Sequence, residues 1–339
     1  MAKFFLSKII GIAIAFGLSA SASAQMMING AGATFPYPIY SKWFDEYTKV
    51  DPSVRFNYQS IGSGGGQKQI MSQTVTFGAS DGPMSDDNLG KAPGKILHIP
   101  TVAGAVVITY NLEGSPALKF DGETIAGIFL GQIKKWSDPK IAATNPGVKL
   151  PDKDIVVVHR SDGSGTTFIW TDYLSKVSAE WKSRPGTGTS VSWPTGEGGE
   201  GNEGVARKVA GTPDAIGYAE FIYALFNRLS YALVRNAAGG FVQADLETIA
   251  AAASSSAQAM PPNFRISITN ASGRKSYPVA AFTYLLIPLQ AADAKKGAFL
   301  RDLFGWVFTS GQRQSAALGY GSLPPEIVRR AQQAIESIR

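Results

Sequence analysis

Two spacings of apolar residues alternate along the chain. Short apolar runs, typical of buried strands, are followed by segments in which apolar residues recur every three or four positions, as on one face of a helix. One such face comprises Tyr40, Trp43, Phe44 and Tyr47. The pattern predicts strands at residues 26–29, 54–61, 75–81, 101–111, 155–158 and 215–218, and helices around 40–47, from about 67, and at 124–130, 168–174, 205–210 and 327–338. Strands that alternate with helices indicate an α/β fold with parallel sheets covered by helices on both faces.

A glycine-rich segment, residues 160–167, lies between a predicted strand and a predicted helix. A loop that opens a helix presents free backbone N–H groups and the positive end of the helix dipole, which together form an anion site. Arg160 adds a planar fork of donors suited to a phosphate-like oxyanion. Further hydroxyl donors come from Ser164, Thr166 and Thr167. Glycine and serine also make ordinary strand-to-helix turns, so this loop alone leaves both interpretations open.

Three other predicted strands end in residues of similar chemistry: Thr34 with Phe35, Ser63, and Asp81. Each has a purely structural alternative, since Thr34 could cap a helix, the glycines after Ser63 could form a flexible turn, and Asp81 could be a turn residue. Ligands of parallel sheets bind at the carboxyl ends of strands. Because all of these residues share that position with the 160–166 loop, we predict one site with many donors and a single acceptor.

The first 24 residues have the features of a secretory signal peptide. Lys3 and Lys8 precede an apolar run at 9–18, and small residues ending in Ala24 precede Gln25. The run is shorter than the roughly 20 residues that span a bilayer, although a retained anchor is the alternative. The chain has no cysteine, which excludes disulfides, cysteine-ligated metal and a lipidated cysteine after the cleavage site. We therefore expect cleavage after Ala24 and a soluble periplasmic protein.

Size and charge limit the remaining classes. The chain has 339 residues, of which 44% are hydrophobic, and this is ample for two domains. Its formal net charge of +6 becomes +4 without the signal peptide, and a mildly basic protein suits an anionic ligand. No dense Lys/Arg tract is present, which argues against nucleic acid as a partner.

Seven short motifs lie along the chain, at residues 30–36, 61–65, 77–81, 130–136, 160–166, 215–218 and 320–324. Together they resemble the motifs of the periplasmic phosphate-binding proteins of high-affinity phosphate ABC transporters, and the resemblance covers essentially the whole mature chain. It implies a two-lobed class II periplasmic-binding-protein fold, each lobe a mostly parallel sheet flanked by helices, with the ligand in the interlobe cleft. Lobe I would comprise residues 25–100 and 282–339, and lobe II residues 101–281, joined by paired hinge strands.

The resemblance also implies the binding residues and the partners. The phosphate site would comprise Thr34, Phe35, Ser63, Asp81, Arg160, Asp162, Ser164, Gly165 and Thr166. Because these residues come from both lobes, phosphate would favour the closed state, which would dock on membrane permease subunits. We expect a monomer without a cofactor. The sequence departs from the family pattern at Gly82, where a small side chain is usual, and at Glu197 and Glu200, which would make the loop surface less attractive to an anion.

The chemistry of the two carboxylates supports this assignment. Asp162 would pair with Arg160 and hold its guanidinium, although it could simply close the loop. Asp81 faces an anion favourably only if the ligand has a proton to donate, as hydrogen phosphate has and sulfate has not. A buried acceptor left unpaired costs about 1–3 kcal/mol or more, so Asp81 is expected to select against sulfate.

Three alternatives remain. A secreted phosphatase or serine hydrolase would need chemistry that the chain hardly offers, because it has only His98 and His159 and because Ser164 is not in a Gly-x-Ser-x-Gly motif. A receptor for another oxyanion, such as sulfate, molybdate or a phosphonate, is the closer alternative, against which Asp81 argues. An adhesion or matrix role on the same fold would leave no mark in the sequence.

Overall fold

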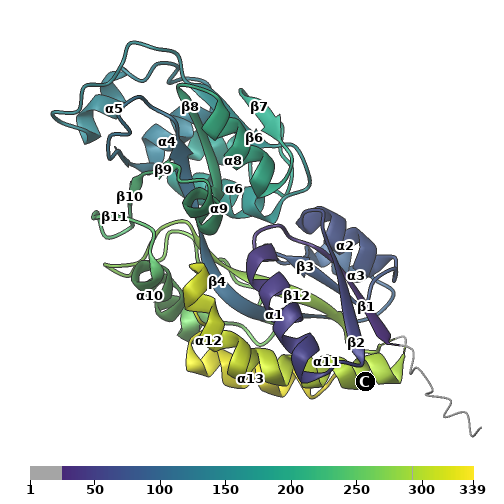
Figure 1. Ribbon diagram of the computed structural model, residues 1–339. Coiled ribbons are helices and arrows are strands. Elements are labelled where there is room, and N and C mark those ends of the chain that lie inside the picture. The colour runs from purple at the N-terminus through teal and green to yellow at the C-terminus, as the bar shows by residue number, and fades with distance from the viewer. Residues whose placement is uncertain (1–24, 292) are drawn as a thin grey trace, which may run out of the picture.

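The computed structural model describes residues 25–291 and 293–339, so the predicted signal peptide lies outside the described residues. Figure 1 shows two parts, each built on a sheet flanked by helices, and the long strand β4 (Ile96–Tyr110) runs from one part into the other beside β12 (Ala280–Pro288). The two-lobed α/β fold predicted from the sequence is confirmed by the structure and by the comparisons described below.

The first part contains three parallel strands. Strand β1 (Met26–Gly32) lies between β2 (Val54–Ser60) and β3 (Phe77–Ser80), and β12 pairs antiparallel with β3. The helical elements here are α1 (Tyr37–Val50), α2 (Ser63–Met71), α3 (Asp86–Lys91), α11 (Ala294–Trp306), η2 (Val307–Gly311), α12 (Gln312–Ser315), η3 (Ala316–Leu318) and α13 (Pro325–Ile335).

The second part repeats this plan. Strand β6 (Val156–Arg160) lies parallel to β7 (Glu197–Gly199) and to β8 (Ala215–Glu220), and β8 pairs antiparallel with β4. The other strands are β5 (Lys119–Phe120), β9 (Ser230–Tyr231), β10 (Leu233–Arg235) and β11 (Phe241–Val242). The helical elements are α4 (Gly122–Phe129), α5 (Pro139–Thr144), α6 (Gly165–Val177), α7 (Ala179–Ser183), α8 (Gly201–Gly211) and α9 (Phe221–Phe226). Helix α10 (Leu246–Ser256), which is followed by η1 (Ala257–Ala259), instead packs on the connecting strands β4 and β12 and lies toward α12 and α13 in Figure 1.

Strand β4 connects the two parts through hydrogen bonds. Its residues 96–105 pair with β12, and residues 106–110 pair with β8, giving the strand order β2-β1-β3-β12-β4-β8-β6-β7 with β9 beside β4. From His98 to Tyr110 every residue of β4 is buried. A strand enclosed on both faces reads as a continuous apolar run, which explains why the sequence pattern identified it.

The glycines after Ser63 were expected to form a loop, with a helix from about residue 67, but α2 already begins at Ser63. Glycine disfavours helices by about 1 kcal/mol relative to alanine, so local preference pointed the wrong way. The reason is packing: a Cβ at Gly66 would lie 2.6 Å from the Cα of Gly32 and 2.7 Å from the carbonyl oxygen of Ala79. Only glycine lets α2 lie directly on β1 and β3.

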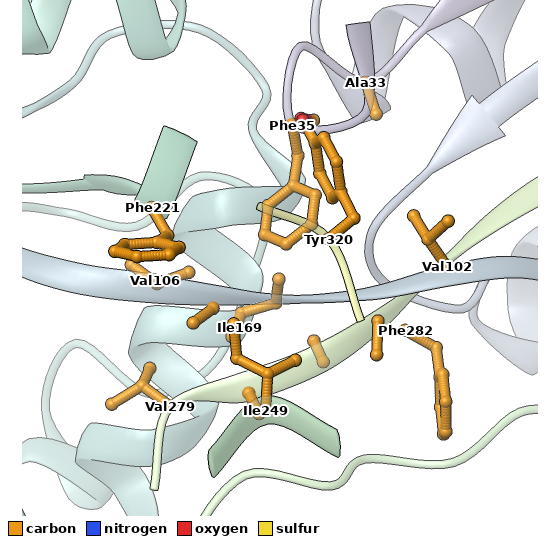
Figure 2. Packing of buried hydrophobic residues seen from close by; sticks show 14 of the residues in the cluster. Ala33, Phe35, Val102, Val106, Ile169, Phe221, Ile249, Val279, Phe282 and Tyr320 are labelled. Carbon is orange, nitrogen blue, oxygen red and sulfur yellow. The ribbon is translucent and has the colours of Figure 1, made fainter. Parts of the chain in front are cut away.

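The core where the two parts meet is aromatic. Figure 2 shows the rings of Phe35 and Tyr320 side by side next to β4, and their centroids are 6.3 Å apart. The Tyr320 hydroxyl donates to the carbonyl oxygen of Phe35 at 2.6 Å. Gly104 on β4 leaves the space that the Phe35 ring occupies. The loop from β1 to α1 is thereby fixed on the strand that joins the parts.

In the described part of the chain, none of the helices is both long and apolar enough to span a bilayer. Residues 25–291 and 293–339 also hold no group of three or more His, Cys, Asp or Glu side chains arranged for a metal ion.

Candidate functional site

The polar strand ends singled out in the sequence lie together between the two parts. From the first part come Thr34 and Phe35 after β1, Ser63 at the start of α2 and Asp81 after β3; from the second part comes the 160–166 loop, which joins β6 to α6. Hydrogen bonds and direct packing connect these segments. The buried members are Thr34, Phe35, Ser63, Asp81, Arg160, Ser164, Gly165 and Thr166, and Asp162 is partly exposed.

Asp81 is held in place by two hydroxyl groups. Thr283 Oγ1, on β12, donates to Asp81 Oδ1 at 2.8 Å, and Ser63 Oγ approaches Oδ2 at 3.3 Å. The backbone N–H of Asp81 donates to Ser63 Oγ at 3.1 Å. The carboxylate therefore has a fixed orientation at the end of β3.

Two carboxyl groups near the site have raised pKa values. Burial raises the pKa of Asp81 from 3.8 to about 7, although the Thr283 hydrogen bond and the charge of Arg160 act in the opposite direction. Burial also raises the pKa of Glu220 well above its usual range. Burial thus favours the neutral form of both carboxyl groups, and Asp81 titrates near neutral pH.

Arg160 is fixed by three side-chain hydrogen bonds. Its Nε donates to Asp162 Oδ1 at 2.7 Å, its Nη2 to Oδ2 at 2.5 Å, and its Nη1 to Thr166 Oγ1 at 3.2 Å. Asp162 Oδ1 also accepts the backbone N–H of Gly201 at 3.0 Å. Partial burial acts to raise the pKa of Asp162, but the hydrogen bonds from Arg160 hold it below its usual value. Asp162 thus makes both of the contacts considered from the sequence, orienting Arg160 and closing the loop.

The N-terminus of α6 faces the same place. Ser164 is its N-cap, and its Oγ accepts the backbone N–H of Thr167 at 3.0 Å. The N–H groups of Gly165 and Thr166 lie in the first turn, where they have no partner within the helix and carry the positive end of its dipole. Thr167 was a candidate donor, but its hydroxyl pairs with Tyr218 at 2.6 Å. The α6 terminus therefore offers backbone donors from Gly165 and Thr166 and the hydroxyl of Thr166.

Direct contacts hold the two parts together around these groups. The backbone N–H of Gly64 donates to the carbonyl oxygen of Gly163 at 2.8 Å, and the Tyr223 hydroxyl donates to the carbonyl oxygen of Thr34 at 2.6 Å. Gly82 allows this approach, because a Cβ there would collide with the ring of Phe168 on α6. The structure is that of two closely apposed parts with the polar residues enclosed.

A cleft of about 490 Å³ opens beside the enclosed residues. Among its lining residues are Thr34 and Asp162 of the candidate site and the exposed, charged side chains of Glu200, Arg207 and Lys208. Lys208 Nζ lies 3.3 Å from Glu197 Oε2, so this ion pair offsets part of the repulsion expected from the acidic loop.

Comparisons with known proteins assign this arrangement to a family. A profile described as PBP superfamily domain matches residues 19–309. The phosphate-binding protein PstS of Pasteurella multocida is 47% identical over 323 residues, covering 95% of this chain and 93% of that protein. The chain belongs to the PstS family of phosphate-binding proteins. PstS of Haemophilus influenzae is 46% identical over 303 residues, covering 89% of this chain and 90% of that protein.

Solved structures support the PstS fold. A high-affinity periplasmic phosphate-binding protein, determined with phosphate at pH 8.5, matches with a TM-score of 0.75 at 24% identity, covering 91% of this chain and 93% of that one. A phosphate-binding protein from Stenotrophomonas maltophilia matches with a TM-score of 0.67 at 21% identity, covering 91% of this chain and 93% of that one. PstS relatives are binding proteins rather than enzymes, which sets aside the phosphatase alternative.

Three polar residues around the candidate site were not found from the sequence. Asn202 donates from Nδ2 to Thr34 Oγ1 at 2.8 Å, while Thr283 bonds Asp81 and Tyr223 bonds the Thr34 backbone. Thr283 and Tyr223 lie in apolar segments that read as strand and helix core. Asn202 lies within the glycine-rich segment at 196–204, of which only the acidic residues Glu197 and Glu200 were considered.

Proposed function

We propose that this chain binds inorganic hydrogen phosphate between its two parts and delivers it to an ABC-type phosphate importer. The names of its PstS relatives support the ligand. The donors gathered around Arg160 support it chemically, since guanidinium groups, hydroxyls and helix N-terminal amides all stabilise phosphate oxygens. The observation that carries the proposal is the position of Asp81, a buried carboxylate among these donors. Asp81 lies so close to the start of α6 that a Cβ on Gly165 would collide with it.

A carboxylate in such a place distinguishes protonated from unprotonated oxyanions. Hydrogen phosphate can donate its proton to Asp81 Oδ2 while its other oxygens accept from the donors. Sulfate would oppose its lone pairs to those of Asp81 and leave a buried acceptor unpaired. Sites that require a ligand's hydrogen bond can reject an analogue without it by roughly 10⁴-fold. Asp81 is the residue that selects phosphate over sulfate.

The phosphate-binding residues lie on both parts, so the two parts close around phosphate after it binds. Lobe I comprises residues 25–100 and 282–339, and lobe II residues 101–281, so both changes of lobe fall within the paired strands β4 and β12. Phosphate contacts Thr34, Phe35, Ser63 and Asp81 from lobe I and Arg160, Ser164, Gly165 and Thr166 from lobe II, with Asp162 supporting Arg160. A ligand that contacts both lobes only in the closed form shifts the equilibrium toward it.

The cellular setting follows from the same proposal. The signal peptide is removed after Ala24, and the mature chain acts in the periplasm as a monomer without a cofactor. Membrane permease subunits receive the closed, loaded form. The names of the relatives and the periplasmic location of one structurally similar phosphate-binding protein support this setting.

Calorimetric titration of the mature chain, unfolded and refolded to remove bound anion, tests the proposal. Phosphate and then sulfate are titrated near pH 8, where Asp81 is ionised. We expect tight one-to-one phosphate binding and no heat from sulfate. Comparable binding of both would favour the alternative, a general oxyanion receptor, and no binding of either by a folded sample would overturn phosphate uptake.

A further inference from the structure

Asn202 connects the two lobes through hydrogen bonds to both threonines of the site. Its Nδ2 donates to Thr34 Oγ1 at 2.8 Å and to Thr166 Oγ1 at 3.0 Å. These residues come from different lobes, and the three side chains are buried. An amide NH₂ group has two hydrogens, so one is available for each hydroxyl oxygen.

The orientation of the Asn202 amide is fixed by a hydrogen bond on the side away from the threonines. Its Oδ1 accepts the backbone N–H of Glu220 at 2.8 Å. A backbone N–H can only donate, so the oxygen of the amide must face Glu220 and the NH₂ group must face the threonines. Asn202 is therefore a donor toward Thr34 and Thr166, never an acceptor.

This fixes the direction in which the two hydroxyls act. Thr166 Oγ1 accepts from Asn202 and, at 3.2 Å, from Arg160 Nη1, so both of its lone pairs are used. Thr34 Oγ1 accepts from Asn202 as well. Among residues 25–291 and 293–339, neither threonine hydroxyl donates a hydrogen bond. Each buried O–H proton is thus available to an acceptor such as a bound anion.

We propose that Asn202 is a positioning residue that converts the Thr34 and Thr166 hydroxyls into obligate donors toward the bound anion, one from each lobe. Without it, a hydroxyl can rotate and present a lone pair to the anion. With it, that orientation is blocked, and the same amide joins the lobes when they close. This inference rests on the proposed binding of phosphate and adds the residue that controls two of its donors.

The decisive variant is Asn202→Asp. The new side chain has nearly the same shape and keeps an oxygen for the Glu220 N–H, but it replaces the NH₂ donor by a second acceptor. Both threonine hydroxyls then donate to residue 202 instead of to the anion. Loss of two hydrogen bonds to a charged group predicts a phosphate affinity at least about 100-fold weaker. Asn202→Ala, which leaves the hydroxyls free to rotate, is expected to weaken binding by only about 10-fold.

A double-mutant cycle separates this role from charge and from packing. Asn202→Asp is measured by calorimetry in the natural chain and in a Thr34→Val, Thr166→Val background, with circular dichroism to establish folding. If Asn202 acts through the hydroxyls, its effect falls to less than about 10-fold once they are absent. Equal effects in both backgrounds would show simple repulsion of the anion and would overturn the proposal.

Two further measurements complete the test. Asn145→Asp is the matched control, because Asn145 Oδ1 likewise accepts a backbone N–H, from Lys119 at 2.8 Å, and its amide is buried away from the site. It should leave phosphate affinity unchanged. If Asn202→Asp does not fold, the cycle is run with Asn202→Ala, and an equal loss in both backgrounds then overturns the inference. Failure of the natural chain itself to bind phosphate would instead overturn the proposed function, and this inference with it.

Discussion

Gly165, at the start of α6, packs directly against the carboxylate of Asp81 at the end of β3. A Cβ at residue 165 would collide with Asp81 and with Ser63 Oγ, which lie on the opposite lobe. The glycine is needed for the approach of the lobes and not for its backbone conformation, since its φ lies outside the positive range.

Gly165→Ala should therefore hinder closure while leaving each lobe intact. Overpacking at a tight contact costs about 1–3 kcal/mol, so phosphate affinity should fall by roughly 10-fold to 100-fold. Calorimetry measures the affinity, and thermal unfolding without phosphate measures the stability of the lobes. Gly211→Ala, at the end of α8 where a Cβ meets open space, is the control and should change neither. Unchanged affinity of Gly165→Ala would mean that phosphate binding does not require this contact.

Replacing Asp81 by Asn should weaken the discrimination against sulfate. The Asn amide can donate to a sulfate oxygen, whereas the ionised Asp81 can only accept. If selectivity of roughly 10⁴-fold depends on this acceptor, the variant should retain less than about a hundredth of it. Competition of sulfate against phosphate in calorimetric titrations at pH 8 gives the ratio directly. A ratio equal to that of the natural chain would remove Asp81 from its selective role.

The natural chain should also discriminate less strongly against sulfate at acidic pH. Because burial raises the pKa of Asp81 to about 7, the carboxyl is protonated below that pH and becomes a donor. Sulfate binding should then appear as the pH falls from 8 to 5.5, and it should be nearly independent of pH in Asp81→Asn. Sulfate affinity that stays undetectable at pH 5.5 in the folded natural chain would contradict this expectation.

Asp81 also links stability to pH. Since its pKa is raised from 3.8 to about 7, its stabilising contribution is fully present below about pH 4 and is lost as the pH rises through 7. The side chain of Asp81→Asn is neutral at every pH. The free energy of unfolding of this variant, minus that of the natural chain, should therefore increase between pH 4.5 and 8 by an amount on the order of a few kcal/mol. Urea unfolding of phosphate-free samples measures this difference.

The comparison of the two proteins isolates Asp81. Burial lowers the pKa of His98 to about 4, so His98 acts with the opposite sign over part of the same range. His98 is present in both proteins, and its contribution cancels in the difference. Parallel stability curves from pH 4.5 to 8 would show that Asp81 does not titrate in this interval.

The sequence was sufficient to predict that the candidate residues lie together, because they stand at strand ends. Glycine-rich segments mark the start of α2 and of α6, and Arg160 follows an apolar strand, so each signal is local. The supporting residues give no such signal. Thr283 meets Asp81 across 202 residues of chain, and Asn202 meets Thr34 across 168, so their roles depend on strand pairing and closure.

The fold, too, depends on long-range contacts that the sequence pattern does not reveal. Periodicity identified β1 to β4, β6 and β8, but it missed β12, which pairs with both β3 and β4, and the helix α11. It also placed the start of α2 several residues too late, because glycine has a low helix propensity. What determines that start is the close packing of Gly66 on β1 and β3, which appears only in three dimensions. The ion pair between Lys208 on α8 and Glu197 on β7 likewise depends on how these two elements pack.

Arg160→Lys separates the geometry of the cation from its charge. Lysine keeps the positive charge but cannot make the two-bond pair with Asp162 and the bond to Thr166 together, since it lacks the planar fork. Hydrogen bonds to charged groups contribute about 1.5–3 kcal/mol, so phosphate affinity should fall by roughly 10-fold to 100-fold. Arg330→Lys, at an arginine that donates to the backbone carbonyls of Met260 and Pro261, is the control and should bind phosphate normally. If Arg160→Lys binds as tightly as the natural chain, charge alone suffices at this position, and the pairing with Asp162 has no role in binding.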